Sequence, residues 1–145
     1  MTQSRRAFLR ASGLAALGLV PAYMQAHAQD PRASLVIGAA REWLQKIDSG
    51  DAAGSHANAG AKFRKALGVA EWSAALANER APRGALAQRT AQQTTFDPKL
   101  DQAPPGNYAI VQFRTAFAHQ SVAQETLTLE READGRWRVI GYFVR

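Results

Sequence analysis

The chain has 145 residues, no cysteine, 46% hydrophobic and 21% charged residues, and a formal net charge of +6. This size fits one globular domain with a short appendage, so a multidomain enzyme is excluded. The lack of cysteine excludes a disulfide framework, a thiolate zinc site and an iron–sulfur cluster, so a packed core must stabilise the fold.

Residues 1–28 have the three zones of a secretory signal peptide. A basic end precedes a mildly apolar stretch over residues 11–20, and Pro21 follows it. That stretch is much shorter than the roughly 20 apolar residues that a membrane-spanning helix needs. We therefore expect an export signal and no stable membrane anchor.

The basic end carries a recognisable export motif. Arg5 and Arg6, with Phe8 and Leu9 directly downstream, resemble the twin-arginine export signal of bacteria. The weakly hydrophobic, glycine-containing middle suits that route better than general secretion. An ordinary signal peptide that happens to hold adjacent arginines is the alternative.

The end of the signal predicts where the mature protein begins. Ala26 and Ala28 place small side chains where a signal peptidase needs them, so we expect cleavage after Ala28 and a single mature domain over residues 29–145 in the periplasm. The twin-arginine export machinery and the signal peptidase are the partners expected during export. The mature chain keeps 15 basic and 12 acidic residues, a balance of +3. Without a basic stripe interleaved with aromatic residues, this balance does not favour nucleic acid as a partner.

The first half of the mature chain has the period of amphipathic helices. Asp30 and Pro31 form a helix start, and apolar residues recur at helical spacing until Asp48. Shorter helical segments are expected after it, over residues 52–58, 62–67 and 69–79. Pro82 and Gly84 should end the last of them.

From Gly84 onward the apolar period changes to two, which is typical of strands. Four strands are expected, over residues 85–96, 108–118, 121–132 and 137–144. Helices followed by an antiparallel meander predict an α+β fold, with N-terminal helices packed on a curved four-stranded antiparallel sheet. On the last strand, Trp137, Val139, Gly141 and Phe143 are expected to share the inward face.

Nearly the whole mature chain carries a set of short stretches in a recognisable order. These are residues 40–44, 47–51, 71–72, 80–84 and 135–142. Their order and spacing resemble a family of small exported bacterial proteins known as domain of unknown function 4019. The resemblance implies a roll of helices on a curved sheet, similar to the cystatin-like or nuclear-transport-factor-2-like folds, and no established activity. His56 stands where a tryptophan is expected in this family.

Two charged residues are expected to meet on the concave side of the sheet. Glu125 alternates in phase with Leu127 and Leu129, which predicts an inward carboxylate, and Arg89 interrupts a run of alanines on the first strand. As a structural element, the two would form a buried ion pair. As a functional one, Glu125 would be a desolvated base with a raised pKa, supported by Arg89 or Tyr142.

The sequence carries no metal or cofactor signature. His56 and His119 belong to no His-x-x-x-His motif, and there is no cysteine pair, so we expect neither a metal nor a cofactor. We interpret the protein as a non-enzymatic binding or interaction module for a small ligand or an envelope protein. The alternative is a cofactor-free lyase or isomerase with Glu125 as the base.

Overall fold

The computed structural model describes residues 30–145. Outside these residues lie the expected export signal and cleavage positions, Arg5, Arg6, Phe8, Leu9, Ala26 and Ala28. No helix within residues 30–145 is long and apolar enough to cross a membrane. In this part of the chain the helices come first and the strands follow.

The helical half begins as the sequence predicts. Its helices are α1 (Pro31–Asp48), α2 (Ala52–Ala57), α3 (Ala61–Ala66) and α4 (Val69–Ala75), and α4 continues into a π-helical turn (Leu76–Arg80) and a 3₁₀ turn (Ala81–Arg83). The Asp30 carboxylate caps α1 by accepting a hydrogen bond from the Arg32 N–H at 2.9 Å, and Pro31 takes the first helical position. One stripe of α1 is buried, over Val36, Ala40, Trp43, Leu44 and Ile47.

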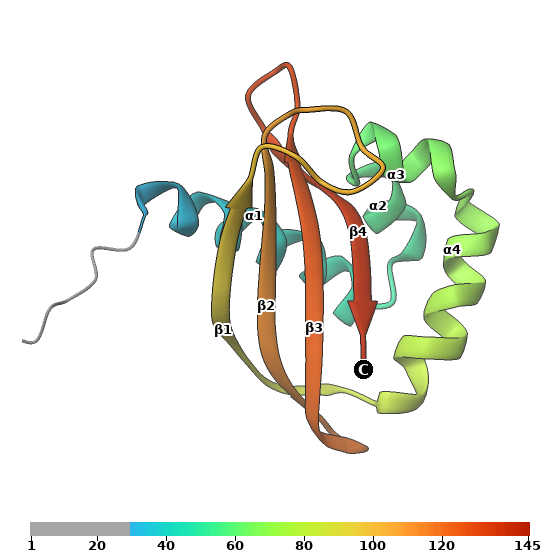
Figure 1. Cartoon of the computed structure of the whole chain (residues 1–145). Coiled ribbons are helices and arrows are strands. Elements are labelled where there is room, and N and C mark those ends of the chain that lie inside the picture. Colours follow the sequence, from blue (N-terminus) through green and yellow to red (C-terminus); the bar gives the residue numbers. More distant parts are fainter. Residues whose placement is uncertain (1–29) are drawn as a thin grey trace, which may run out of the picture.

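The second half forms one antiparallel sheet. Its strands, in spatial as in chain order, are β1 (Leu86–Asp97), β2 (Tyr108–Phe117), β3 (Gln120–Arg131) and β4 (Trp137–Val144). Figure 1 shows α1 crossing behind the strands and α2 to α4 lying beside β4. The predicted fold class, helices packed on a curved four-stranded antiparallel sheet, is confirmed.

Large aromatic side chains fill the space between α1 and the sheet. Trp43 stacks on Trp72 with 5.7 Å between ring centroids, and Phe63 lies edge-on to Trp72 at 5.0 Å. Tyr142 lies edge-on to Trp43 at 5.6 Å. Ser55 accepts both indole N–H groups, that of Trp43 on its carbonyl at 2.7 Å and that of Trp72 on its hydroxyl at 2.8 Å. The concave side is therefore packed, and the two indole N–H groups buried in it have hydrogen-bond partners.

Strand β4 does not keep a simple alternation, and the expectation that Phe143 faces inward is wrong. Its side chain is 59% exposed. The pairing of β3 with β4 shifts between Thr128 and Leu129, so that Ile140 is an extra residue in β4. Such a β-bulge reverses the alternation of the residues beyond it. Tyr142 consequently points inward in place of Phe143.

Trp137 and His56 lie at the margin of the core. Trp137 is half-buried and edge-on to Phe96, with 6.0 Å between the rings. The His56 ring lies edge-on to Phe63 at 6.1 Å, and its Nε2 is 2.7 Å from the Leu67 carbonyl oxygen. The His56 position thus keeps an aromatic contact although it does not hold a tryptophan.

Candidate functional site

The structure brings together Arg89, Glu125 and Tyr142, the three site candidates from the sequence. Arg89 donates to the Glu125 carboxylate twice, from Nε to Oε2 at 2.6 Å and from Nη2 to Oε1 at 3.0 Å. The Tyr142 hydroxyl donates to Oε1 at 2.7 Å. The Thr115 hydroxyl donates to Oε2 at 2.6 Å. Four donors therefore enclose a carboxylate that has no exposed surface.

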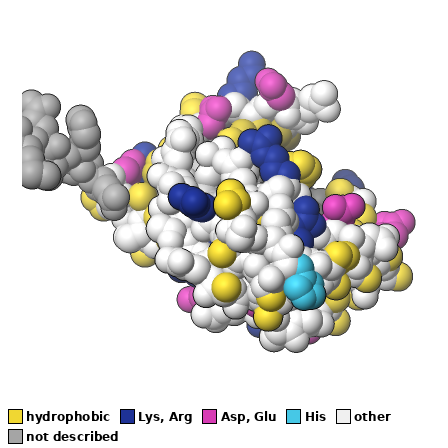
Figure 2. All heavy atoms as spheres, turned by 90° about the horizontal axis from the view of Figure 1, so that it is seen from below, with side chains coloured by type: hydrophobic (Ala, Val, Ile, Leu, Met, Phe, Trp, Pro, Cys, Tyr) yellow, Lys and Arg dark blue, Asp and Glu magenta, His cyan; other side chains and the backbone are white. Residues whose placement is uncertain are grey.

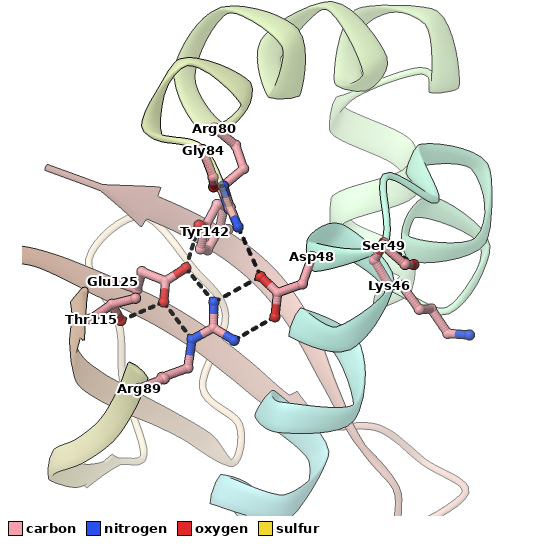
Figure 3. A network of polar contacts seen from close by, with 9 residues as sticks. All are labelled: Lys46, Asp48, Ser49, Arg80, Gly84, Arg89, Thr115, Glu125 and Tyr142. Carbon is pink, nitrogen blue, oxygen red and sulfur yellow. Dashed lines mark hydrogen bonds and ion pairs between the residues drawn. The ribbon is translucent and has the colours of Figure 1, made fainter. Parts of the chain in front are cut away.

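A second carboxylate lies on the other side of the Arg89 guanidinium (Figure 3). Asp48, the last residue of α1, accepts from Arg89 Nη1 at 2.6 Å and from Nη2 at 3.0 Å. Asp48 also accepts from Arg80 Nη2 at 3.1 Å, and Arg80 Nη1 donates to the Gly84 carbonyl at 2.6 Å. We call the following six residues the buried network: Asp48, Arg80, Arg89, Thr115, Glu125 and Tyr142.

The strand register places the sheet members of the buried network on one face. Arg89 on β1 lies directly opposite Thr115 on β2, and Glu125 on β3 lies opposite Phe113, two residues from Thr115. Residues two apart on a strand point to the same face, so Arg89, Thr115 and Glu125 form a diagonal across three strands. The end of α1 lies over this diagonal and supplies Asp48.

The charges of the buried network balance, with two guanidinium groups against two carboxylates. Burial raises the pKa of the Tyr142 hydroxyl well above its ordinary value, and the negative charge of Glu125 raises it further, so the phenol remains a donor. Burial acts to lower the pKa of Arg89, but the hydrogen bonds to Asp48 and Glu125 outweigh it, and the pKa of Arg89 is raised. Arg89 and Tyr142 therefore hold their protons firmly.

This arrangement is suited to holding elements together. A general base needs a lone pair that a substrate proton can reach. Glu125 has four hydrogen-bond donors and 0% exposure, so it offers no free edge. Two members of the network, Asp48 and Arg80, border a cleft of about 400 Å³ between α1, α4 and the start of β1. We call this the Asp48 cleft.

Asp48 and Arg80 were not singled out as site residues from the sequence, although each carries a signal. Asp48 places a carboxylate in the last turn of a helix, where the dipole disfavours negative charge. Arg80 follows Trp72 and Leu76 at intervals of four, which puts it on their face. Its guanidinium lies 4.1 Å from the centre of the Phe117 ring.

The structure keeps His56 and His119 apart. His56 packs in the helical layer, whereas His119 is exposed on the β2–β3 turn with Nδ1 3.2 Å from the Pro82 carbonyl oxygen. Within residues 30–145, no group of three or more His, Cys, Asp or Glu side chains is placed to hold a metal ion.

The fold and the buried network together define a small α+β roll with a filled interior. The chain belongs to the family described as "Protein of unknown function (DUF4019)", whose family model matches residues 39–142, so the resemblance seen in the sequence is confirmed. The 1.8 Å structure of Aln2 from a Streptomyces species is similar at 16% identity, over 80% of this chain and 91% of that one, with a TM-score of 0.47. No curated protein matches the chain.

Proposed function

We propose that this protein is a non-enzymatic binding module that is exported to the periplasm by the twin-arginine route. The observation that carries the binding role is that Glu125, the candidate base, is fully buried and surrounded by hydrogen-bond donors. The packed aromatic interior supports the same interpretation, because it leaves no chamber around Glu125. Ligands would then be held in clefts at the surface of the domain.

The alternative is a cofactor-free lyase or isomerase with Glu125 as base. It would require Glu125 to release donors from Arg89, Thr115 or Tyr142 before it could accept a substrate proton. A carboxylate freed from Arg89 would be buried and uncompensated, at a cost of about 3–5 kcal/mol. The buried network therefore favours the binding role.

A docking surface for an envelope protein would be expected to be a broad exposed apolar patch. The large exposed apolar side chains of residues 30–145 lie on five different elements: Leu35, Val69, Leu86, Val122 and Phe143. In the face seen in Figure 2, hydrophobic side chains form small separate groups between polar and backbone atoms. These features support a small ligand over a large protein partner.

The export part of the proposal is tested with the signal motif. Replacing Arg5 and Arg6 together by lysine should leave the protein in the cytoplasmic fraction, and the periplasmic wild-type protein should begin at Gln29 on N-terminal sequencing. Undiminished export of the double variant would contradict the twin-arginine route. A periplasmic protein that begins at Met1 would contradict cleavage.

The binding part is tested by a ligand screen on the purified protein. Backbone amide resonances are recorded while small anionic, neutral and cationic molecules are added, and each mixture is followed for chemical turnover. We expect saturable shifts at a surface cleft without turnover. Turnover that Glu125→Gln abolishes, in a variant that remains folded, would establish the enzyme instead.

A further inference from the structure

A second cleft borders the middle and C-terminal part of α1, which contributes Ala39, Glu42, Trp43 and Lys46 to its lining. It has a volume of about 440 Å³, within the roughly 300–1,000 Å³ typical of small-molecule sites. The residues that line it come from α1, the α2–α3 region, the turn that joins β3 to β4 and the start of β4. We call it the basic cleft, after the basic residues that line it: Lys46, Arg64, Arg136 and Arg138.

The basic groups of this cleft are not all neutralised. Arg138 pairs with Glu132 at 3.0 Å and with Asp134 at 2.7 Å. Among the described residues, by contrast, the side chains of Lys46 and Arg136 have no hydrogen-bond or ion-pair partner. Lys46 points away from the buried network (Figure 3), and Arg136 is exposed, so these two charges are available to a ligand.

Arg64 is held in place while remaining charged. Its Nη1 donates to the Ala57 carbonyl at 3.2 Å and to the Ala59 carbonyl at 2.8 Å, and no carboxylate of the described chain pairs with it. Glu42 on α1 is the one lining acid of the described residues without a basic partner. The groups without a partner of opposite charge thus number three cations against one anion.

Two tryptophans also line the basic cleft. Trp43 and Trp137 both line it, so that apolar ring surface lies beside the cations. Guanidinium groups bind carboxylate and phosphate groups through two parallel hydrogen bonds, and a cleft lined with one sign of charge concentrates the field acting on a ligand. Separate cations from α1, α3 and the β3–β4 turn suit a ligand with more than one anionic group.

We propose that the basic cleft binds a small polyanion, a molecule carrying two or more carboxylate or phosphate groups, through Lys46, Arg64 and Arg136. This inference rests on the binding role proposed above and gives it a ligand class and a place. The half-buried ring of Trp137 contacts the apolar part of the ligand. Glu42 opposes the binding and limits the affinity.

The test titrates the purified full chain with citrate as a polycarboxylate and with pyrophosphate as a phosphate probe. The ionic strength is held at about 0.15 M so that non-specific attraction is screened. We expect a Kd of about 1 mM or tighter for at least one probe. The indole N–H resonance of Trp137 should move, and that of Trp72 should move less, because Trp137 lines this cleft and Trp72 does not.

Variants separate this site from general electrostatics. Replacing Lys46 and Arg136 together by glutamine should weaken binding about tenfold or more, because two charge-assisted contacts are lost. Glu42→Gln should tighten binding about twofold, because one opposing charge is removed. The matched control is Arg114→Gln, an exposed arginine on β2 outside this cleft, which should stay within about twofold of the wild type.

Three outcomes overturn the proposal. They are the absence of saturable binding of both probes, equal weakening by the control and by the double variant, and shifts that map to the Asp48 cleft. If neutral or cationic molecules bind while both anions fail, only the ligand class is wrong and the binding role stands. If no molecule of any charge binds, the proposed binding role is contradicted as well.

Discussion

Substitution of Arg89 probes the centre of the buried network. Arg89→Met removes four hydrogen bonds, two to Glu125 and two to Asp48, while it keeps an unbranched apolar stem of similar length. Two carboxylates are then left close together without the cation between them. Glu125→Gln is the partner change, since it removes one charge and conserves the shape of the side chain.

The expected loss in free energy of unfolding follows from the burial of both side chains. The side chains of Arg89 and Glu125 are 5% and 0% exposed, so water cannot replace the lost partner. Breaking such a pair costs about 3–5 kcal/mol, a large share of the roughly 5–15 kcal/mol that stabilises a domain. We expect Arg89→Met to lower the free energy of unfolding more than Glu125→Gln does, because it leaves two carboxylates without their shared cation.

A double-mutant cycle by urea denaturation measures the coupling between the two residues. The double variant should recover part of the loss and give a coupling energy of at least about 1 kcal/mol. The Arg138–Asp134 pair on the surface is the control, and Arg138→Gln should move the denaturation midpoint far less. Small, additive effects of Arg89→Met and Glu125→Gln would refute the assignment of a buried, coupled pair.

Further predictions concern the rest of the network and the core. Asp48→Asn should lower the free energy of unfolding by about 2–3 kcal/mol in urea, less than Arg89→Met, because Asp48 is 16% exposed. The pKa of Tyr142 is higher in the folded than in the unfolded chain, so above about pH 10 only the unfolded chain loses this proton and stability falls as the pH rises. Phenolate absorbance should show Tyr142 titrating only on unfolding, and Tyr142→Phe should remove that share of the pH dependence. Trp43→Ala should cost about 3–5 kcal/mol in thermal or urea unfolding, and more than Trp137→Ala, because Trp43 is 3% exposed and central to the aromatic cluster.

The helical layer, the sheet and three of the six residues of the buried network could be predicted from the sequence. Alternation with Leu127 and Leu129 indicated the inward Glu125, and the alanines around Arg89 indicated its partner. These signals are local, because a strand exposes every second residue to the same face. The cap at Asp30 and the buried stripe of α1 could be predicted for the same reason, because they also depend on residues that are close together in the chain.

The other half depends on contacts distant in the chain. Asp48 and Arg80 are 32 positions apart, and only the packing of α1 against the end of the π-helical turn brings them together. Phe143 was placed on the wrong face because no residue type marks Ile140 as the site of a bulge. The basic cleft likewise combines three separate segments, none of which is a motif by itself.

We propose that the buried network holds the fold together, whereas the basic cleft at the surface holds the ligand. The most direct test is the Kd of Glu125→Gln for the polyanion that binds the wild type, measured by calorimetry once circular dichroism shows that the variant is folded. We predict a Kd within about twofold of the wild-type value, because Glu125 does not line the basic cleft. Loss of binding by the folded variant would contradict this separation and place Glu125 in the ligand site.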